Sequence, residues 1–339
     1  MIIYDVAEAY NYPRNEFREG NIPAGKVKKL FVFGDSYADT GNWPSTASKS
    51  WKPPYGITFP GKPSGRFSDG RVLTDYIASY LGIRPPSPYC QLKIFNTNTT
   101  QYGINFAHGG TGVFKTLVDQ PNMTTQIDFF QQLIDKSVFT TRDLSSSIAL
   151  VSLAGNDYSA YLANNGSLED LPKFTKSVIN QLILDVKRIN RFGIKKIGIT
   201  GLEPVGCLPR STASASYEYC NTEENKFSES HNQMLKQNLG ALNDEAAAPV
   251  FIYLDLYNAF TSALKIQQNP SGNSSNKLKP CCIGANGEDC GTTDQNGHNI
   301  YVVCKNPKLS FFWDSIHPSN AGWGTVYSAL ERSLNAFLL

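Results

Sequence analysis

The sequence predicts an α/β fold built on a mainly parallel sheet, because two kinds of segment alternate along the chain. Short apolar runs of strand length alternate along the chain with longer stretches whose apolar residues recur at helical spacing. Strands separated by helices pair in parallel, and the helices then cover both faces of the sheet. The 339 residues, of which 41% are hydrophobic, suffice for a large core, and we find neither an internal repeat nor a flexible linker. We therefore expect one domain.

The elements follow from this alternation. Apolar, β-prone runs mark the expected strands at residues 30–33, 148–153, 196–200 and 250–255. Helical spacing marks the expected helices at residues 72–81, 123–134, 171–191, 223–242 and 321–338. The 171–191 helix is the clearest, because Val178, Leu182 and Val186 recur at helical intervals. Gly193 follows its basic last turn, where a helix commonly ends.

Two long segments are predicted to be loops. Residues 43–70 are rich in Pro, Gly, Ser and aromatic side chains, and residues 267–307 are rich in Asn, Gly and Cys. Long loops within compact domains tend to be functional. Each of these two segments adjoins a candidate catalytic segment, so we expect them to wall a substrate pocket.

The charge of the chain argues against several classes of partner. Its formal net charge is only +2, and its Lys and Arg residues are scattered rather than clustered. This distribution argues against a nucleic-acid surface or an anionic membrane as the main partner. No apolar stretch approaches the length that spans a bilayer, so we expect a soluble protein without stable membrane insertion. The sequence leaves the oligomeric state open.

The N-terminus and the modification motifs predict different cellular compartments. Residues 1–8 contain early acidic residues and do not read as a secretory signal. The chain nevertheless contains 7 cysteines, and Asn-x-Ser/Thr sequons lie at Asn98, Asn122, Asn165 and Asn273. Both features are typical of the secretory pathway. We therefore expect a secreted or vacuolar glycoprotein.

The cysteines allow either a metal site or disulfides. A zinc site would use Cys281, Cys282, Cys290 and Cys304, with His298 nearby. The spacing contains no Cys-x-x-Cys pair, however, and adjacent cysteines rarely share one structural metal. We therefore favour disulfides and expect Cys207 to pair with Cys220. Pairing leaves one of the 7 cysteines over, and Cys90 lies away from the others.

Ser36 is the candidate nucleophile. It follows Gly34-Asp35 at the end of a predicted strand, and such a strand delivers a hydroxyl to the carboxyl edge of a parallel sheet, where open α/β folds bind ligands. A serine nucleophile needs a base, and the base needs an orienting group. Asp314 and His317 provide both within one short turn. Taken alone, Ser36 more often indicates a helix N-cap, and the Asp314 turn a cap or a surface turn.

Two further segments offer hydrogen-bond donors to an oxyanion. Residues 105–112 form a glycine-rich turn that contains Gly110, where a backbone N–H approaches a ligand closely because no Cβ intervenes. Asn156 follows the predicted 148–153 strand, so its side-chain amide is a neutral donor on the same sheet edge as Ser36.

The chain has 4 histidines, of which only His317 has an acidic residue three positions upstream. His231 lies in a polar helical stretch and His298 in the Asn/Gly-rich loop, so we expect both to be solvent exposed. His108 precedes Gly110 by two residues, and its role stays open.

The segments around Ser36, Gly110, Asn156 and His317, in this order, resemble the GDSL or SGNH hydrolase family, and specifically its plant esterase/lipase branch. Further phrases similar to plant members are Gly-Arg-Phe-Ser-Asp-Gly-Arg from Gly65, Pro-Val-Gly-Cys-Leu-Pro from Pro204, and Phe312-Trp313-Asp314. The resemblance extends over about residues 30–338. It implies a flavodoxin-like three-layer α/β/α domain at residues 28–339, preceded by an N-terminal extension at residues 1–27.

The same resemblance implies a role for each candidate residue. Ser36 is the nucleophile, His317 the general base and Asp314 the group that orients it. The N–H groups of Ser36 and Gly110 and the amide of Asn156 form the oxyanion hole. The implied protein is a serine esterase or lipase that hydrolyses a small-molecule carboxylic ester through an acyl-enzyme, with no metal or organic cofactor.

Two alternatives remain at this point. With an alcohol as acceptor, the same triad would make the protein an acyltransferase, and no residue separates this activity from hydrolysis. A non-catalytic ligand-binding protein on the same scaffold is the other alternative. The presence of every catalytic position argues against it.

Overall fold

A six-stranded parallel sheet forms the centre of the molecule. The computed structural model describes residues 27–93, 97–153, 155–266, 277–285 and 289–337. The strand order is β2-β3-β1-β4-β5-β6, and every neighbouring pair is parallel. The strands are β1 (Lys29–Gly34), β2 (Ser87–Pro88), β3 (Gly103–Asn105), β4 (Ser147–Ser152), β5 (Lys196–Thr200) and β6 (Phe251–Leu254). The four strands expected from the sequence are thus confirmed, and two short strands, β2 and β3, extend the sheet beyond β1.

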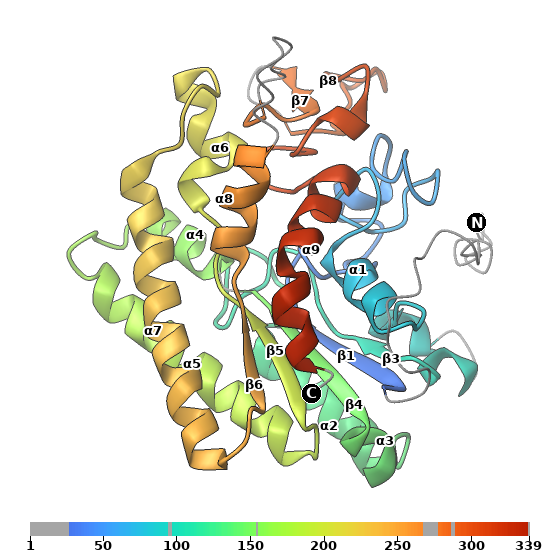
Figure 1. Cartoon of the computed structure of the whole chain (residues 1–339). Helices are drawn as coiled ribbons and strands as arrows, with labels where there is room; N and C mark the ends of the chain where they lie inside the picture. Colours follow the sequence, from blue (N-terminus) through green and yellow to red (C-terminus); the bar gives the residue numbers. More distant parts are fainter. Residues whose placement is uncertain (1–26, 94–96, 154, 267–276, 286–288, 338–339) are drawn as a thin grey trace.

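Helices cover both faces of the sheet, which confirms the three-layer α/β/α architecture (Figure 1). Side chains alternate along β1, so Phe31 and Phe33 lie in one core and Leu30 and Val32 in the other. The first core is covered by α2 (Met123–Asp135), α5 (Leu171–Arg191) and α7 (Thr222–Ala246). The second is covered by α1 (Leu73–Tyr80), α8 (Leu256–Ile266) and α9 (Asn320–Leu334). Shorter helices are α3 (Thr141–Ser145), α4 (Gly155–Ala163) and α6 (Pro209–Thr212).

The helix ends differ little from the predicted ones, except in α7 and α9. The side chain of Asn221 accepts the N–H groups of Glu223 and Glu224, so α7 starts one residue earlier than expected. It continues to Ala246, and Ala247 then adopts a left-handed conformation that ends it. The α9 helix stops at Leu334 rather than 338. No helix in the described part of the chain is long and apolar enough to cross a membrane.

The predicted 267–307 loop contains an antiparallel hairpin. Strands β7 (Cys282–Gly284) and β8 (Tyr301–Val303) pair within it, beside the 43–70 loop (Figure 1). The prediction of an irregular loop is therefore wrong over these residues, whereas 267–276 and 286–288 lie outside the described residues. The 43–70 segment forms only a short 3-10 turn at Lys49–Trp51.

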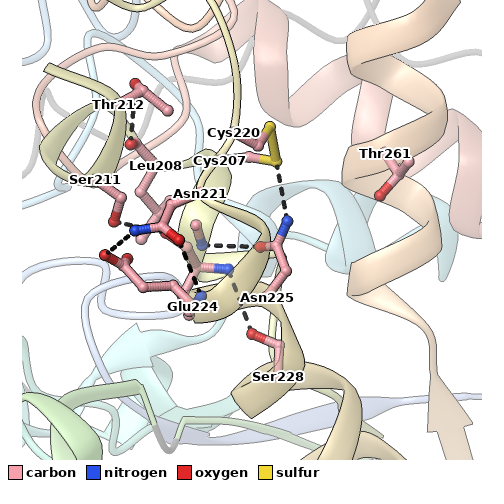
Figure 2. The surroundings of a disulfide bond; sticks show 12 residues. Cys207, Leu208, Ser211, Thr212, Cys220, Asn221, Glu224, Asn225, Ser228 and Thr261 are labelled. Atoms are coloured by element: carbon pink, nitrogen blue, oxygen red, sulfur yellow. Dashed lines mark hydrogen bonds between the residues drawn. A yellow bond between two sulfur atoms is a disulfide. The ribbon is translucent and has the colours of Figure 1, made fainter. Parts of the chain in front are cut away.

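The cysteines form disulfides rather than the alternative zinc site. The pairs are Cys207–Cys220, Cys281–Cys304 and Cys282–Cys290. The predicted Cys207–Cys220 pair is thereby confirmed, and it lies next to the first turns of α7 (Figure 2). Cys90 is the cysteine outside these disulfides, as expected.

Candidate active site

The end of β1 presents Ser36 at the carboxyl edge of the sheet. A Cβ at Gly34 would lie 2.1 Å from the Ser152 carbonyl oxygen of β4, so only glycine allows the two strands to approach here. The side chain of Asp35 then accepts the N–H of Tyr37 at 3.0 Å and holds the turn. No helix starts at Ser36, which excludes the N-cap alternative.

Ser36, His317 and Asp314 form a continuous hydrogen-bond chain. The Ser36 Oγ atom lies 2.8 Å from His317 Nε2. On the other side of the ring, His317 Nδ1 lies 2.8 Å from Asp314 Oδ2. The helix cap before α9 is Ser319 rather than Asp314, and Asp314 is only 5% exposed. The Asp314 turn is thus neither a helix cap nor a surface turn, and it holds a carboxylate against an imidazole.

The surroundings of Asp314 favour its ionised form. Burial alone would raise the pKa of this carboxyl, but the His317 ring and the N–H groups of His317 and Ile316 outweigh burial and hold the pKa below its usual range. Those N–H groups donate to Asp314 Oδ1 at 2.8 and 2.9 Å. A carboxylate that stays ionised keeps the imidazole oriented and stabilises it when it takes up a proton.

The three expected oxyanion donors lie close to the Ser36 turn. Asn156, in the first turn of α4, lines one cavity together with Ser36, and its amide donates to the Thr111 carbonyl at 3.0 Å. Gly110 has a φ of +75° and belongs to a loop whose His108 N–H donates to the Gly34 carbonyl at 3.0 Å. Among the described residues, neither the Ser36 N–H nor the Gly110 N–H donates a hydrogen bond to another backbone group.

Comparison with known proteins assigns the family. The profile of the GDSL-like Lipase/Acylhydrolase family matches residues 30–330. The chain belongs to this family. It is 49% identical to GDSL esterase/lipase At5g03610 of Arabidopsis thaliana, over 92% of this chain and 88% of that protein. It is 47% identical to GDSL esterase/lipase At3g09930 of the same plant, over 96% of this chain and 92% of that protein. Acetylajmalan esterase 2 of Rauvolfia serpentina is 30% identical, over 86% of each chain. The protein is accordingly a carboxylic ester hydrolase of the GDSL type.

Tyr55 of this GDSL hydrolase makes a contact with Asp314 that the sequence does not predict. Its buried hydroxyl donates to Asp314 Oδ2 at 2.8 Å, from a position 259 residues away in the chain. Behind it, the N–H groups of Cys281 and Cys282 donate to the carbonyls of Phe312 and Trp313 at 3.0 and 2.7 Å. The disulfide-bonded hairpin therefore supports the segment that ends in Asp314. No sequence motif signals a contact between such distant residues.

Gln126 and Asp157 also support the site, and neither was singled out from the sequence. The Gln126 side chain accepts the Gly34 N–H at 2.8 Å and donates to the Gly34 carbonyl at 2.9 Å, so α2 fixes the end of β1. Asp157 accepts the N–H groups of Val113 and Phe114 at 2.9 and 2.8 Å, which fixes the loop after Gly110 to α4. Polar residues at these helix positions resemble ordinary surface residues in the sequence.

The cavity that reaches Ser36 is not lined by either of the two long loops. Its lining comes from the ends of β1, β4 and β5 and from segments after them, including Glu203, Arg210 and Ile316. The expectation that both loops wall the pocket is therefore wrong for this cavity. The 43–70 loop instead packs against His317, because the centre of the Phe67 ring lies 5.1 Å from the centre of the His317 ring.

The solvent exposure of the other histidines agrees only in part with the prediction from the sequence. His298 is exposed, with 76% of its side chain accessible. His231, expected to be exposed, is fully buried, and its Nδ1 lies 2.8 Å from the Tyr158 hydroxyl. The polar residues around it in sequence hide the fact that it shares the inner face of α7 with Leu235 and Leu239. His108 is buried in the Gly110 loop, with Nδ1 2.8 Å from the Phe106 carbonyl.

Proposed function

We propose that Ser36, His317 and Asp314 are the catalytic triad of this ester hydrolase, within a single catalytic domain at residues 28–339 that follows the extension at 1–27. The observation that supports it most strongly is the pair of hydrogen bonds on opposite sides of the His317 ring, to Ser36 and to Asp314. A neutral imidazole in this position accepts a proton from the serine, and the carboxylate opposite stabilises the resulting imidazolium.

The reaction then proceeds in two halves. Ser36 Oγ attacks the ester carbonyl carbon while its proton moves to His317 Nε2, and the carbonyl oxygen becomes an oxyanion. Collapse of this intermediate breaks the bond to the alcohol oxygen, which leaves with the proton from His317. Water, deprotonated by His317, next attacks the acyl-enzyme, and Ser36 leaves as the hydroxyl. The N–H groups of Ser36 and Gly110 and the Asn156 amide stabilise both oxyanions.

Asn156→Ala tests the oxyanion assignment. Loss of one such donor should lower kcat by about 10²–10³-fold, whereas Asn164→Ala, an asparagine further along in sequence, should leave kcat within about twofold. Circular dichroism of both variants controls for folding. An Asn156→Ala enzyme that is folded and fully active would refute the assignment.

Product analysis tests whether water is the acceptor. Incubation of the enzyme with an acetate ester, with and without added glycerol, should release free acetate in both cases. Transfer of most acetyl groups to glycerol at low glycerol concentration would show an acyltransferase instead.

The disulfides are compatible with an extracellular or secretory compartment, and we infer that the protein is secreted or vacuolar and glycosylated at Asn165. Asn165 is exposed after α4, whereas the Asn122 side chain caps α2 by accepting the Thr125 N–H at 3.1 Å. The side chains of Asn98 and Asn273 lie outside the described residues. Treatment of plant-expressed protein with an N-glycosidase should lower its mass, and Asn165→Gln should reduce this shift. Unchanged mass would contradict glycosylation.

A further inference from the structure

The cavity that begins at Ser36 also reaches a buried carboxyl group. Glu203 lies shortly after the end of β5, lines this cavity together with Ser36 and Asn156, and is only 7% exposed. A Cβ placed on Gly155 would have Glu203 Oε1 as its near neighbour, at 3.9 Å. The carboxyl thus lies beside the start of α4, close to the residue that offers the oxyanion amide.

In the part of the chain that the structure describes, Glu203 takes part in none of the salt bridges. Arg210 lines the same cavity, but its Nη1 donates to the Ser159 hydroxyl at 3.3 Å. Burial raises the pKa of Glu203, although the charge of Arg210 and the hydroxyl of Tyr37 act in the opposite direction. Glu203 is thus a buried carboxyl on the wall of the cavity that reaches Ser36, with the Tyr37 hydroxyl and the Arg210 side chain as its polar neighbours.

The backbone around Glu203 is anchored on two sides. The disulfide Cys207–Cys220 and the hydrogen bond from the Gly206 N–H to Asn225 Oδ1, at 2.9 Å, join this segment to α7 (Figure 2). On the other side, the Arg210 N–H donates to the Ser315 carbonyl at 2.9 Å, next to the triad turn. Glu203 and Arg210 therefore hold fixed positions relative to Ser36.

We propose that Glu203 is a specificity-determining residue that restricts this cavity to short, hydroxyl-bearing groups and excludes long hydrocarbon chains. A hydrocarbon chain would strip water from the carboxyl and offer no hydrogen bond in exchange, which is unfavourable. A hydroxyl group on the substrate donates to the carboxylate instead, and Arg210 donates to a second oxygen. The proposal rests on Ser36 being the nucleophile, because the cavity is then where part of the ester binds.

A comparison of kcat/KM between substrates with short and long chains tests the proposal. We would measure kcat/KM for 4-nitrophenyl acetate and octanoate, which vary the acyl group, and for glycerol monoacetate and octyl acetate, which vary the alcohol. Glu203→Leu should raise the ratio of long to short substrate at least about tenfold in one series. Glu203→Gln, which keeps the shape of the side chain, should raise it less. The control Glu218→Gln, at an exposed position outside the cavity, should leave both ratios unchanged.

The series that responds identifies which part of the ester occupies the cavity. Ratios within twofold of wild type in both series, for both Glu203 variants, would overturn the proposal. Labelling of Ser36 by a fluorophosphonate separates this failure from that of the proposed function. Normal labelling with unchanged ratios refutes the role of Glu203 alone, whereas a wild-type protein that is neither labelled nor active refutes the triad. Should Glu203→Leu fail to fold, Glu203→Gln decides the outcome.

Discussion

At the scale of single residues, Tyr55 extends the hydrogen-bond chain of Ser36, His317 and Asp314 beyond the carboxylate. The Asp314 carboxylate accepts N–H groups from its own turn on Oδ1, while Oδ2 accepts the Tyr55 hydroxyl at 2.8 Å. Hydrogen bonds to a charged acceptor are stronger than neutral ones. Tyr55 is therefore a positioning residue that fixes the orientation of the carboxylate and, through it, of His317.

Tyr55→Phe should lower kcat by roughly tenfold and change KM little, because the ring keeps its packing while the carboxylate loses one donor. The measurement is steady-state kinetics on a short-chain ester. Tyr76→Phe is the matched control, since it also removes a largely buried hydroxyl, one that donates to the Asn320 carbonyl at 2.7 Å. Equal losses in both variants would show that the effect is structural and not specific to Asp314.

His231 should make the protein less stable in acid. Burial lowers its pKa to about 3, and its Nε2 finds no partner among the described residues. Because the folded pKa lies below the unfolded value, the folded state binds fewer protons, and stability present near pH 7 is lost as the pH falls toward 3.

We expect the stability difference between wild type and His231→Gln to narrow on acidification. The wild type should lose roughly 2 to 3 kcal/mol more than the variant between pH 7 and pH 4.5. Urea unfolding at the two pH values measures this change. Parallel pH profiles for the two proteins would contradict a buried, neutral His231.

At the scale of elements, the site depends on helices that fix strand ends and loops. The Gln126 side chain, projecting from α2, satisfies both backbone groups of Gly34, where β1 turns toward Ser36. Asp157 of α4 does the same for two N–H groups of the loop that follows Gly110. The Ser36 turn and the Gly110 loop thus receive their positions from different helices of the surrounding layers.

Gln126→Leu should destabilise the fold and reduce activity. It leaves the Gly34 N–H buried without its partner, while the Gly34 carbonyl keeps the His108 N–H and the Thr111 hydroxyl as donors. This should lower the free energy of unfolding by about 1 to 3 kcal/mol. Chemical denaturation measures the loss. Gln131→Leu, in the same helix but with its side chain bonded only to exposed Asp135 at 2.8 Å, should change stability by less than about 1 kcal/mol. A Gln126→Leu protein as stable as wild type would show that the two hydrogen bonds between Gln126 and Gly34 contribute little to the free energy of unfolding.

At the scale of the whole molecule, the sequence predicts the layers because the four longer strands and the longer helices each contain enough residues to show a recognisable hydrophobic pattern. It missed β2 and β3, whose two and three residues are too short for a pattern. It also missed the β7–β8 hairpin, which disulfides and contacts with the segment before Asp314 hold in place.

The residues of the candidate site likewise fall into those that the sequence predicts and those that it does not. Residues inside short motifs, such as Ser36 and His317, were identified because each motif pairs a residue type with a chemical role. Tyr55 and Gln126 were not, because their partners lie 259 and 92 residues away and only the folded chain brings them together. His231 was misjudged because a polar neighbourhood in sequence does not reveal which side of a helix faces the core.

The central claim is that Ser36 is an activated nucleophile, and covalent labelling tests it most directly. We would treat wild type and Ser36→Ala with a fluorophosphonate and determine intact mass and the modified peptide. A single adduct on Ser36, absent from the folded variant, is the predicted result. A folded wild type that hydrolyses esters but remains unlabelled at Ser36, or a Ser36→Ala protein that retains full activity, would contradict it.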